Sequence, residues 1–213
     1  MNAMSNPASM RTAIEMRVKK EYAQTQLNED NKIIDGIQKF ILMAQQHQSL
    51  RPVLKDAAIT IFRLFPFKEI TIGLKSPKDG LYRYEEILGH SKSAEQAHRS
   101  LAYTYEEFFD SKDYPAIRLS KYTEFALLEE QPFLENEKDT YNRPIMLTGV
   151  RKTVYNFVEG DYFDIYMYSP SDEMIGWIEL GATKDGNIPS MITIKWLEFF
   201  ASILSLLVQK HSY

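Results

Sequence analysis

The side chains best suited to hold a small molecule lie in the middle of the chain. Arg118, Lys121 and Tyr122 surround the start of a predicted helix, and a helix N-terminus attracts anions. Taken singly, each side chain is more typical of a surface charge or a structural hydrogen bond, but together they indicate a pocket. The predicted ligand-binding residues are Arg118, Tyr122, Tyr141, Arg143 and Tyr166.

The sequence carries none of the common catalytic or metal-binding motifs. No two of its four histidines stand four residues apart, and no His-Glu-x-x-His motif occurs. His90 and His98 can approach each other, but two histidines alone do not indicate a metal site. Glycine-rich nucleotide loops and the Gly-x-Ser-x-Gly nucleophile motif are also missing. We therefore expect no catalytic residue, no metal and no cofactor.

Composition limits the possible functions further. The 213 residues include 44% hydrophobic and 25% charged residues, with a formal net charge of −4 and no cysteine. Zero cysteines exclude disulfides, thiol nucleophiles and thioether-linked prosthetic groups. The acidic balance argues against a nucleic-acid partner. The apolar runs are short and the N-terminus lacks a secretory core, so we expect a cytoplasmic protein without a membrane partner.

Two helices and two strands are predicted in the first half. Residues 1–30 form a flexible or helical leader with few apolar anchors, and residues 31–213 form the main domain. Apolar residues recur at helical spacing over 33–44, and a second helix begins near Pro52, where a missing N–H costs little. Strands follow at 67–74 and 81–88, separated by the turn sequence Pro-Lys-Asp-Gly.

The second half closes with a strand pair and a helix. Helices are predicted at 90–100, 104–110 and 120–130, strands at 162–168 and 174–180, and a final helix at 192–209. This order predicts an α+β fold. Its centre is an antiparallel sheet of about five to six strands, with the N- and C-terminal helices packed on one face.

The final helix is apolar around most of its circumference. One apolar face can cover the sheet, and the other needs a further partner. That partner is either the N-terminal helices of the same chain or a second copy, and we favour a homodimer built from paired helices. The predicted interface residues are Ile37, Phe40, Trp196, Phe200, Ile203 and Leu207.

Over residues 32–211 the sequence resembles a GAF domain, a small-molecule-binding module of sensor proteins. The resemblance rests on Phe-Lys-Glu-Ile-Thr-Ile-Gly at 67–73, Gly-Trp-Ile-Glu-Leu-Gly at 176–181, and Asp-Gly-Asn-Ile-Pro-Ser at 185–190 before the final helix. The segments 114–124 and 140–144 are similar to those of prokaryotic sensor histidine kinases. The resemblance implies a ligand pocket under the middle segment and helices paired across a dimer.

Departures from the GAF pattern restrict what the resemblance implies. The cysteines of bilin-carrying members and of the methionine-sulfoxide reductases of this fold are absent, and so is the Asn-Lys-Phe-Asp-Glu set of cyclic-nucleotide-binding members. No kinase core is visible, so the signal would pass in trans to a histidine kinase or another signalling protein, or to an output domain outside this chain. The sequence thus predicts a non-catalytic module that senses an unknown small molecule. The alternative is a dimerisation or scaffolding module whose pocket is filled by its own aromatic residues.

Overall fold

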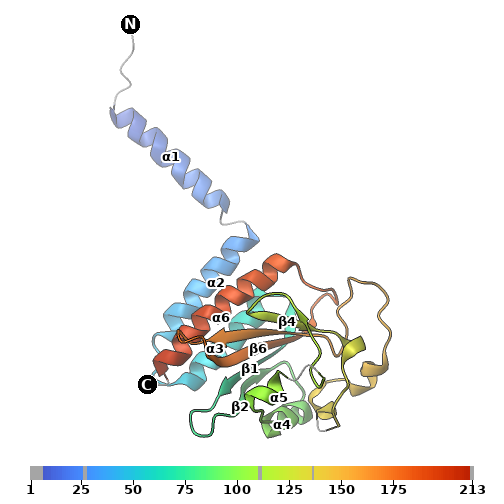
Figure 1. Ribbon diagram of the computed structural model, residues 1–213. Helices are drawn as coiled ribbons and strands as arrows, with labels where there is room; N and C mark the ends of the chain where they lie inside the picture. The colour runs from blue at the N-terminus through green and yellow to red at the C-terminus, as the bar shows by residue number, and fades with distance from the viewer. Residues whose placement is uncertain (1–6, 26–27, 110–111, 136, 212–213) are drawn as a thin grey trace.

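A six-stranded antiparallel sheet forms the centre of the chain in the computed structural model, which describes residues 7–25, 28–109, 112–135 and 137–211. The strand order is β2-β1-β6-β5-β4-β3 (Figure 1). The strands are β1 (Phe67–Lys75), β2 (Tyr82–Leu88), β3 (Ile117–Arg118), β4 (Thr123–Ala126), β5 (Tyr162–Tyr168) and β6 (Met174–Thr183). The predicted α+β class with an antiparallel sheet is confirmed.

Helices cover the two faces of the sheet unequally. The long helices α2 (Glu29–Ala44), α3 (Leu50–Leu64) and α6 (Met191–His211) lie side by side on one face (Figure 1). The opposite face carries α4 (Lys92–Ser100) and α5 (Tyr105–Phe108). Three short 3-10 helices follow in the long connection to β5: η1 (Leu128–Glu130), η2 (Lys138–Thr140) and η3 (Pro144–Thr148).

Helix α1 (Pro7–Thr25) extends away from the rest of the molecule (Figure 1). Its side chains at Met10, Ile14 and Val18 are exposed. This agrees with a leader that has no core face of its own. Residues 1–6 and 26–27 of the predicted leader lie outside the described residues.

The face under the long helices is an apolar core. Alternate residues of the central strands point into it, among them Phe163, Ile165, Ile178 and Leu180, all fully buried. Rings pack around Phe163, whose centroid lies 4.2 Å from that of Phe125 in a stacked pair. Burial of such apolar surface contributes about 25 cal/mol per Å², which makes this face the main source of stability.

Glycine at position 73 is required by the tryptophan on the neighbouring strand. Gly73 and Trp177 are register partners between β1 and β6. A Cβ atom at position 73 would lie 2.0 Å from the indole ring, so any side chain there would overlap it. Trp177 is fully buried, so its indole ring packs in the interior.

The helix predicted over 120–130 is wrong. Thr123–Ala126 form β4, which pairs with β5, and only Leu128–Glu130 are helical. Pairing with the sheet buries Thr123 and Phe125, and this tertiary gain overrides the local helix composition. Ser120 does not cap a helix; its hydroxyl donates to Glu198 Oε1 on α6 at 2.6 Å.

The predicted interface set also needs correction. Ile37, Phe40, Phe200 and Leu207 lie in the chain's own core, where the rings of Phe40 and Phe200 are 4.8 Å apart. These four side chains cannot reach a second copy while the core is closed. Trp196 and Ile203 are only partly buried. The large apolar side chains that α6 leaves exposed are Met191, Ile192, Phe199 and Leu206.

Of the described helices, α6 alone is long and apolar enough to cross a membrane by length and composition. A core helix of a water-soluble domain passes the same test. Its residues Leu197, Ala201 and Leu204 are buried against the sheet and its neighbours. We therefore interpret α6 as the central helix of the core.

Candidate ligand-binding cavity

A cavity of about 430 Å³ lies on the sheet face opposite the long helices. Residues of β4, β5 and β6 form its floor, and α4, α5 and the segment 137–161 supply its walls. This volume falls within the usual range of small-molecule sites. The cavity is therefore the natural candidate for a ligand site.

Three carboxylates cross the cavity floor in one row. Glu124 on β4 is the register partner of Asp164 on β5, and Asp164 is the partner of Glu179 on β6. All three side chains line the cavity. Directly opposed like charges on neighbouring strands repel each other, so the row destabilises the empty protein.

Glu179 is the most contacted member of the row. The hydroxyl of Tyr84 donates to its Oε2 at 3.0 Å, and His98 Nε2 lies 4.0 Å from its Oε1. Burial above all raises the pKa of Glu179 to about 7; the hydrogen bond from Tyr84 opposes this rise, and the carboxylates of Glu137 and Glu69 add to it. A fraction of Glu179 is consequently protonated near neutral pH.

Asp164 is the least satisfied member of the row. Its Oδ1 atom is inaccessible to solvent and has no hydrogen-bond partner among the described residues. Burial raises the pKa of Asp164 well above its usual range, and the charges of Glu179 and Glu124 add to this effect. A buried carboxyl without a partner is costly, which makes this position a candidate contact for a ligand.

Glu124 has two protein partners at the outer end of the row. The hydroxyl of Tyr166 donates to its Oε2 at 2.8 Å. Arg118 Nη1 lies 3.8 Å from its Oε1, but the Arg118 side chain is 61% exposed. This ion pair is therefore weak and screened by solvent.

Aromatic rings make up much of the cavity wall. Tyr103 and Tyr114 both donate to Glu137 Oε1, at 2.8 and 2.6 Å. The Phe109 ring centroid lies 5.2 Å from that of Tyr166. Further rings from Tyr84, Phe108, Tyr141 and Tyr162 line the same space. The site combines apolar ring surface with acidic groups.

His90 and His98 meet at one side of the cavity, with ring centroids 4.6 Å apart. Burial, followed by the neighbouring His98, lowers the pKa of His90 to about 4. Burial also lowers the pKa of His98, so both rings are neutral near pH 7. Within the described part of the chain, no three or more histidine or acidic side chains are placed so that they could hold a metal ion together.

The structure brings together three of the five predicted ligand residues. Arg118, Tyr141 and Tyr166 line the cavity. Tyr122 lies instead against Tyr168 and faces a shallow hollow beside α6. Arg143 forms an ion pair with the buried Glu159, at 2.7 Å between Nη2 and Oε2, and does not line the cavity.

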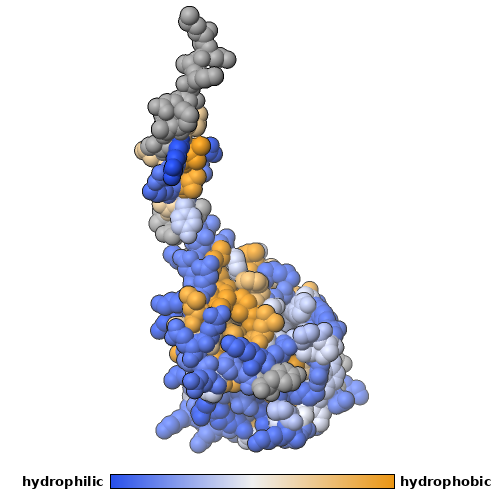
Figure 2. Space-filling model, turned by 90° about the vertical axis from the view of Figure 1, so that its left-hand side faces the viewer, coloured by the Kyte–Doolittle hydropathy of each residue, from blue (hydrophilic) through white to orange (hydrophobic). Residues whose placement is uncertain are grey.

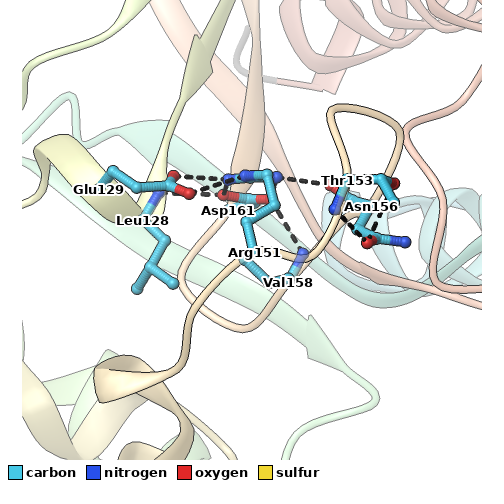
Figure 3. Close-up of polar contacts among 7 residues, drawn as sticks. All are labelled: Leu128, Glu129, Arg151, Thr153, Asn156, Val158 and Asp161. Carbon is cyan, nitrogen blue, oxygen red and sulfur yellow. Dashed lines mark hydrogen bonds and ion pairs between the residues drawn. The ribbon is translucent and has the colours of Figure 1, made fainter.

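Arg151 fastens the segment that covers the cavity (Figure 3). Its guanidinium bonds to both oxygens of Glu129 and of Asp161, at 2.7 to 2.8 Å. Asp161 is buried and also accepts the backbone N–H groups of Leu128 and Val158, each at 2.9 Å. Figure 3 shows these groups converging from both ends of the connection, which fixes it over the sheet.

Sequence reasoning missed the carboxylate row. Asp164 and Glu179 are single acids inside otherwise apolar or aromatic strands, at Tyr-Phe-Asp-Ile-Tyr and Trp-Ile-Glu-Leu. A lone acid in a strand that is covered on both faces is unusual. That exception was a usable signal, but the register that brings the acids together is not visible in the sequence.

Comparison with known proteins gives structural matches alone: no family model matches the sequence, and no curated protein matches it significantly. A GAF/HD-domain protein from Geobacter sulfurreducens is similar over 76% of this chain and 94% of its own, at 13% identity and a TM-score of 0.55. The GAF domain of a phosphoenolpyruvate-protein phosphotransferase from Coxiella burnetii aligns over 86% and 95%, at 9% identity and a TM-score of 0.55.

A third match has a bound substrate. Free methionine-R-sulfoxide reductase from Neisseria meningitidis, in complex with its substrate, aligns over 84% of this chain and 90% of its own. The identity is 8% and the TM-score 0.52. These similarities show that the chain has the fold of a GAF domain, as the sequence indicated.

Proposed function

We propose that this chain is a non-catalytic regulatory module that binds a small molecule in the cavity on the sheet. The observation that carries the proposal is a roomy cavity whose floor holds one buried polar atom with no hydrogen-bond partner among the described residues, Asp164 Oδ1. The GAF fold supports a regulatory, sensory role in general. A cavity filled by its own aromatic residues, as the scaffolding alternative requires, would not leave this space.

An enzymatic role has one specific point in its favour, because one of the structurally similar proteins is a reductase. The present chain contains no cysteine, so it cannot use a thiol for such chemistry. The sequence also carries none of the common nucleophile motifs that could act with the carboxylates of the cavity floor. Turnover of a bound small molecule that is lost with the Asp164→Asn variant would overturn the non-catalytic proposal.

The proposed output is a homodimer of helix pairs. Ile192, Phe199 and Leu206 stand seven residues apart on α6 and are 52 to 66% exposed, a spacing typical of a coiled-coil seam. Figure 2 shows apolar side chains gathered on the helical side of the molecule, below α1. Ligand binding would shift the balance between two arrangements of these helices. In the cytoplasm, the change would pass in trans to a histidine kinase or another signalling protein.

Thermal unfolding with a chemically diverse ligand library tests the binding function. Ala116 is an exposed residue at the cavity rim, so an Ala116→Trp variant should block the entrance without disturbing the core. We expect at least one compound to raise the melting temperature of the wild type and not of this variant. Ala23→Trp, on the exposed surface of α1, is the matched control. Identical responses of the wild type and Ala116→Trp to every compound would contradict the proposal.

The dimer has a separate test. Phe199→Glu places a charge in the middle of the exposed stripe, and light scattering should show dissociation to the monomer. Tyr155→Glu makes the same change at an exposed aromatic residue of a loop, 74% exposed, and should leave the mass unchanged. A wild-type protein that is already monomeric at micromolar concentration would rule out the homodimer.

A further inference from the structure

The cavity floor carries more carboxyl groups than the protein pairs with cationic side chains. Within the described residues that line the cavity, Arg118 is the one arginine or lysine. It approaches only the outermost member of the row, Glu124, and remains largely exposed. The nearby Arg143 and Arg151 are held by Glu159 and Asp161. The two inner carboxyls, Asp164 and Glu179, consequently face the cavity without a cationic partner.

Asp164 provides an independent indication of a missing partner. Its Oδ1 is shielded from solvent and unpaired, although a cavity large enough for a ligand lies directly above the floor. Buried polar atoms in folded proteins nearly always have a hydrogen-bond partner. Because Oδ1 has no solvent-accessible surface, a donor group in the cavity would bond to it once the carboxyl group has turned toward the cavity.

The rings around the row suit the same kind of ligand. Tyr162 and Tyr166 stand two residues before and after Asp164 on the same strand face, and both line the cavity. The faces of tyrosine rings attract cations, more strongly when water is excluded. An anion would find neither a charge partner nor a suitable surface over the inner part of the row.

We propose that the cavity binds an organic cation with protonated amino groups, held between Asp164 and Glu179 and flanked by tyrosine rings. This inference rests on the proposed function and gives the ligand its chemical class. An ammonium group carries three donors, so one can bridge two carboxylates. Neighbouring strands lie about 4.8 Å apart, so a short diamine can place its second ammonium near Glu124. Binding removes the repulsion along the row.

Three four-carbon probes of different charge test the ligand class. Putrescine is a dication, butanediol is its neutral analogue and succinate is a dianion of similar length. Titration calorimetry at about pH 8, where Glu179 is more fully ionised than at pH 7, should show binding of putrescine and none of the other two. Choline, whose charge does not depend on pH, tests whether one fixed cation is sufficient.

Variants of the row locate the binding. Asp164→Asn and Glu179→Gln keep the shape of the side chain and remove the charge, and each should weaken putrescine binding by about 10- to 100-fold. Glu85→Gln, an exposed strand glutamate of the same sheet, should leave the affinity unchanged. Thermal unfolding of each variant confirms that it is folded. Equal putrescine affinity in the wild type and both floor variants would overturn the inference.

The outcomes separate this inference from the proposed function. In one outcome butanediol, succinate or a library compound binds the wild type and not Ala116→Trp, while putrescine and choline do not bind. That result would support the ligand-binding cavity and contradict the cationic ligand class. If no probe or library compound distinguishes the wild type from Ala116→Trp, the binding function itself falls. Binding of putrescine that Ala116→Trp and Asp164→Asn both abolish supports both proposals.

Discussion

The two faces of the sheet are built from the same strands but have different chemistry. On β5, Phe163 and Ile165 point to the long helices, while Asp164 between them points to the cavity. On β6, Ile178 and Leu180 enclose Glu179 in the same way. One face is an apolar core with paired rings, and the other is an acidic floor whose two inner carboxyls have no arginine or lysine partner among the described residues.

The comparison shows how one strand serves stability and binding together. Side chains alternate across a strand, so a single stretch of residues can fill a core on one side and line a cavity on the other. The core side is mainly apolar, whereas the cavity side keeps carboxylates that weaken the empty protein. We infer that the stability supplied by the apolar face allows the protein to fold despite the repulsion between carboxylates on the cavity face. Four substitutions test this inference.

The largest effect is expected from Phe163→Ala on the core face. The ring is fully buried among Phe67, Phe125 and Phe157. Removal of a buried aromatic ring lowers the free energy of unfolding by about 3–5 kcal/mol. Urea denaturation measures it, and Asp164→Asn at the adjacent position should change stability in the opposite direction above neutral pH. Similar losses of unfolding free energy in Phe163→Ala and Asp164→Asn would contradict the proposed difference between the two faces.

The segments that lie over the two faces differ as well: long helices lie over the core, and an irregular connection lies over the cavity. Arg151→Met tests how this connection is held. This change leaves Asp161 buried without its cation, which should lower the free energy of unfolding by about 2–4 kcal/mol. Hydrogen exchange should rise first in the segment 128–161, while the long helices stay protected. Arg83→Met removes an exposed pair with Asp79 and should lower the stability far less than Arg151→Met does.

Most of the fold was predictable because the local sequence of each helix and strand indicates its type. Helical spacing gave α2, α3 and α6, and the strand-rich runs gave β1, β2, β5 and β6 to within a few residues. Segment 120–130 failed, because its strand exists only through pairing with β5. Local composition does not report a partner that lies about forty residues away.

The site was less predictable because it depends on register between distant segments. Of the predicted ligand residues, Arg118, Tyr141 and Tyr166 line the cavity, whereas Tyr122 faces away from it. Residues Glu124, Asp164 and Glu179 meet only through the order of β4, β5 and β6. An anion was expected from Arg118, but the structure adds seven acidic side chains to the lining.

A smaller effect, and one that depends on pH, is expected from Glu179→Gln. Burial raises the pKa of Glu179 from 4.5 in a model peptide to about 7. Between these values the folded protein binds more protons than the unfolded chain, so the stability of the wild type falls as pH rises. The variant should remove about 1–3 kcal/mol of this fall.

Denaturation at a series of pH values checks the Glu179 prediction. The groups that face Glu179 are Tyr84, His98, Asp164, Glu137 and Glu69. Because those that titrate in this pH range still change charge in the variant, its stability keeps part of the dependence on pH. Asp164→Asn should therefore flatten the curve as well, and the double variant more than either. The assigned direction would be contradicted if the free energy of unfolding of the wild type, relative to that of Glu179→Gln, rose between pH 4.5 and 7.

The smallest effect is expected from Tyr166→Phe, which separates the ring from its hydroxyl. The ring remains against Phe109, and only the hydrogen bond to Glu124 is lost. This should lower the free energy of unfolding by about 1 kcal/mol, against almost nothing for Tyr155→Phe at an exposed ring. Putrescine affinity should change little, because the ring face and the row charges are retained. A loss as large as that of Phe163→Ala would instead mean that the polar floor helps to hold the fold together, and the two faces would no longer be distinct in what they contribute.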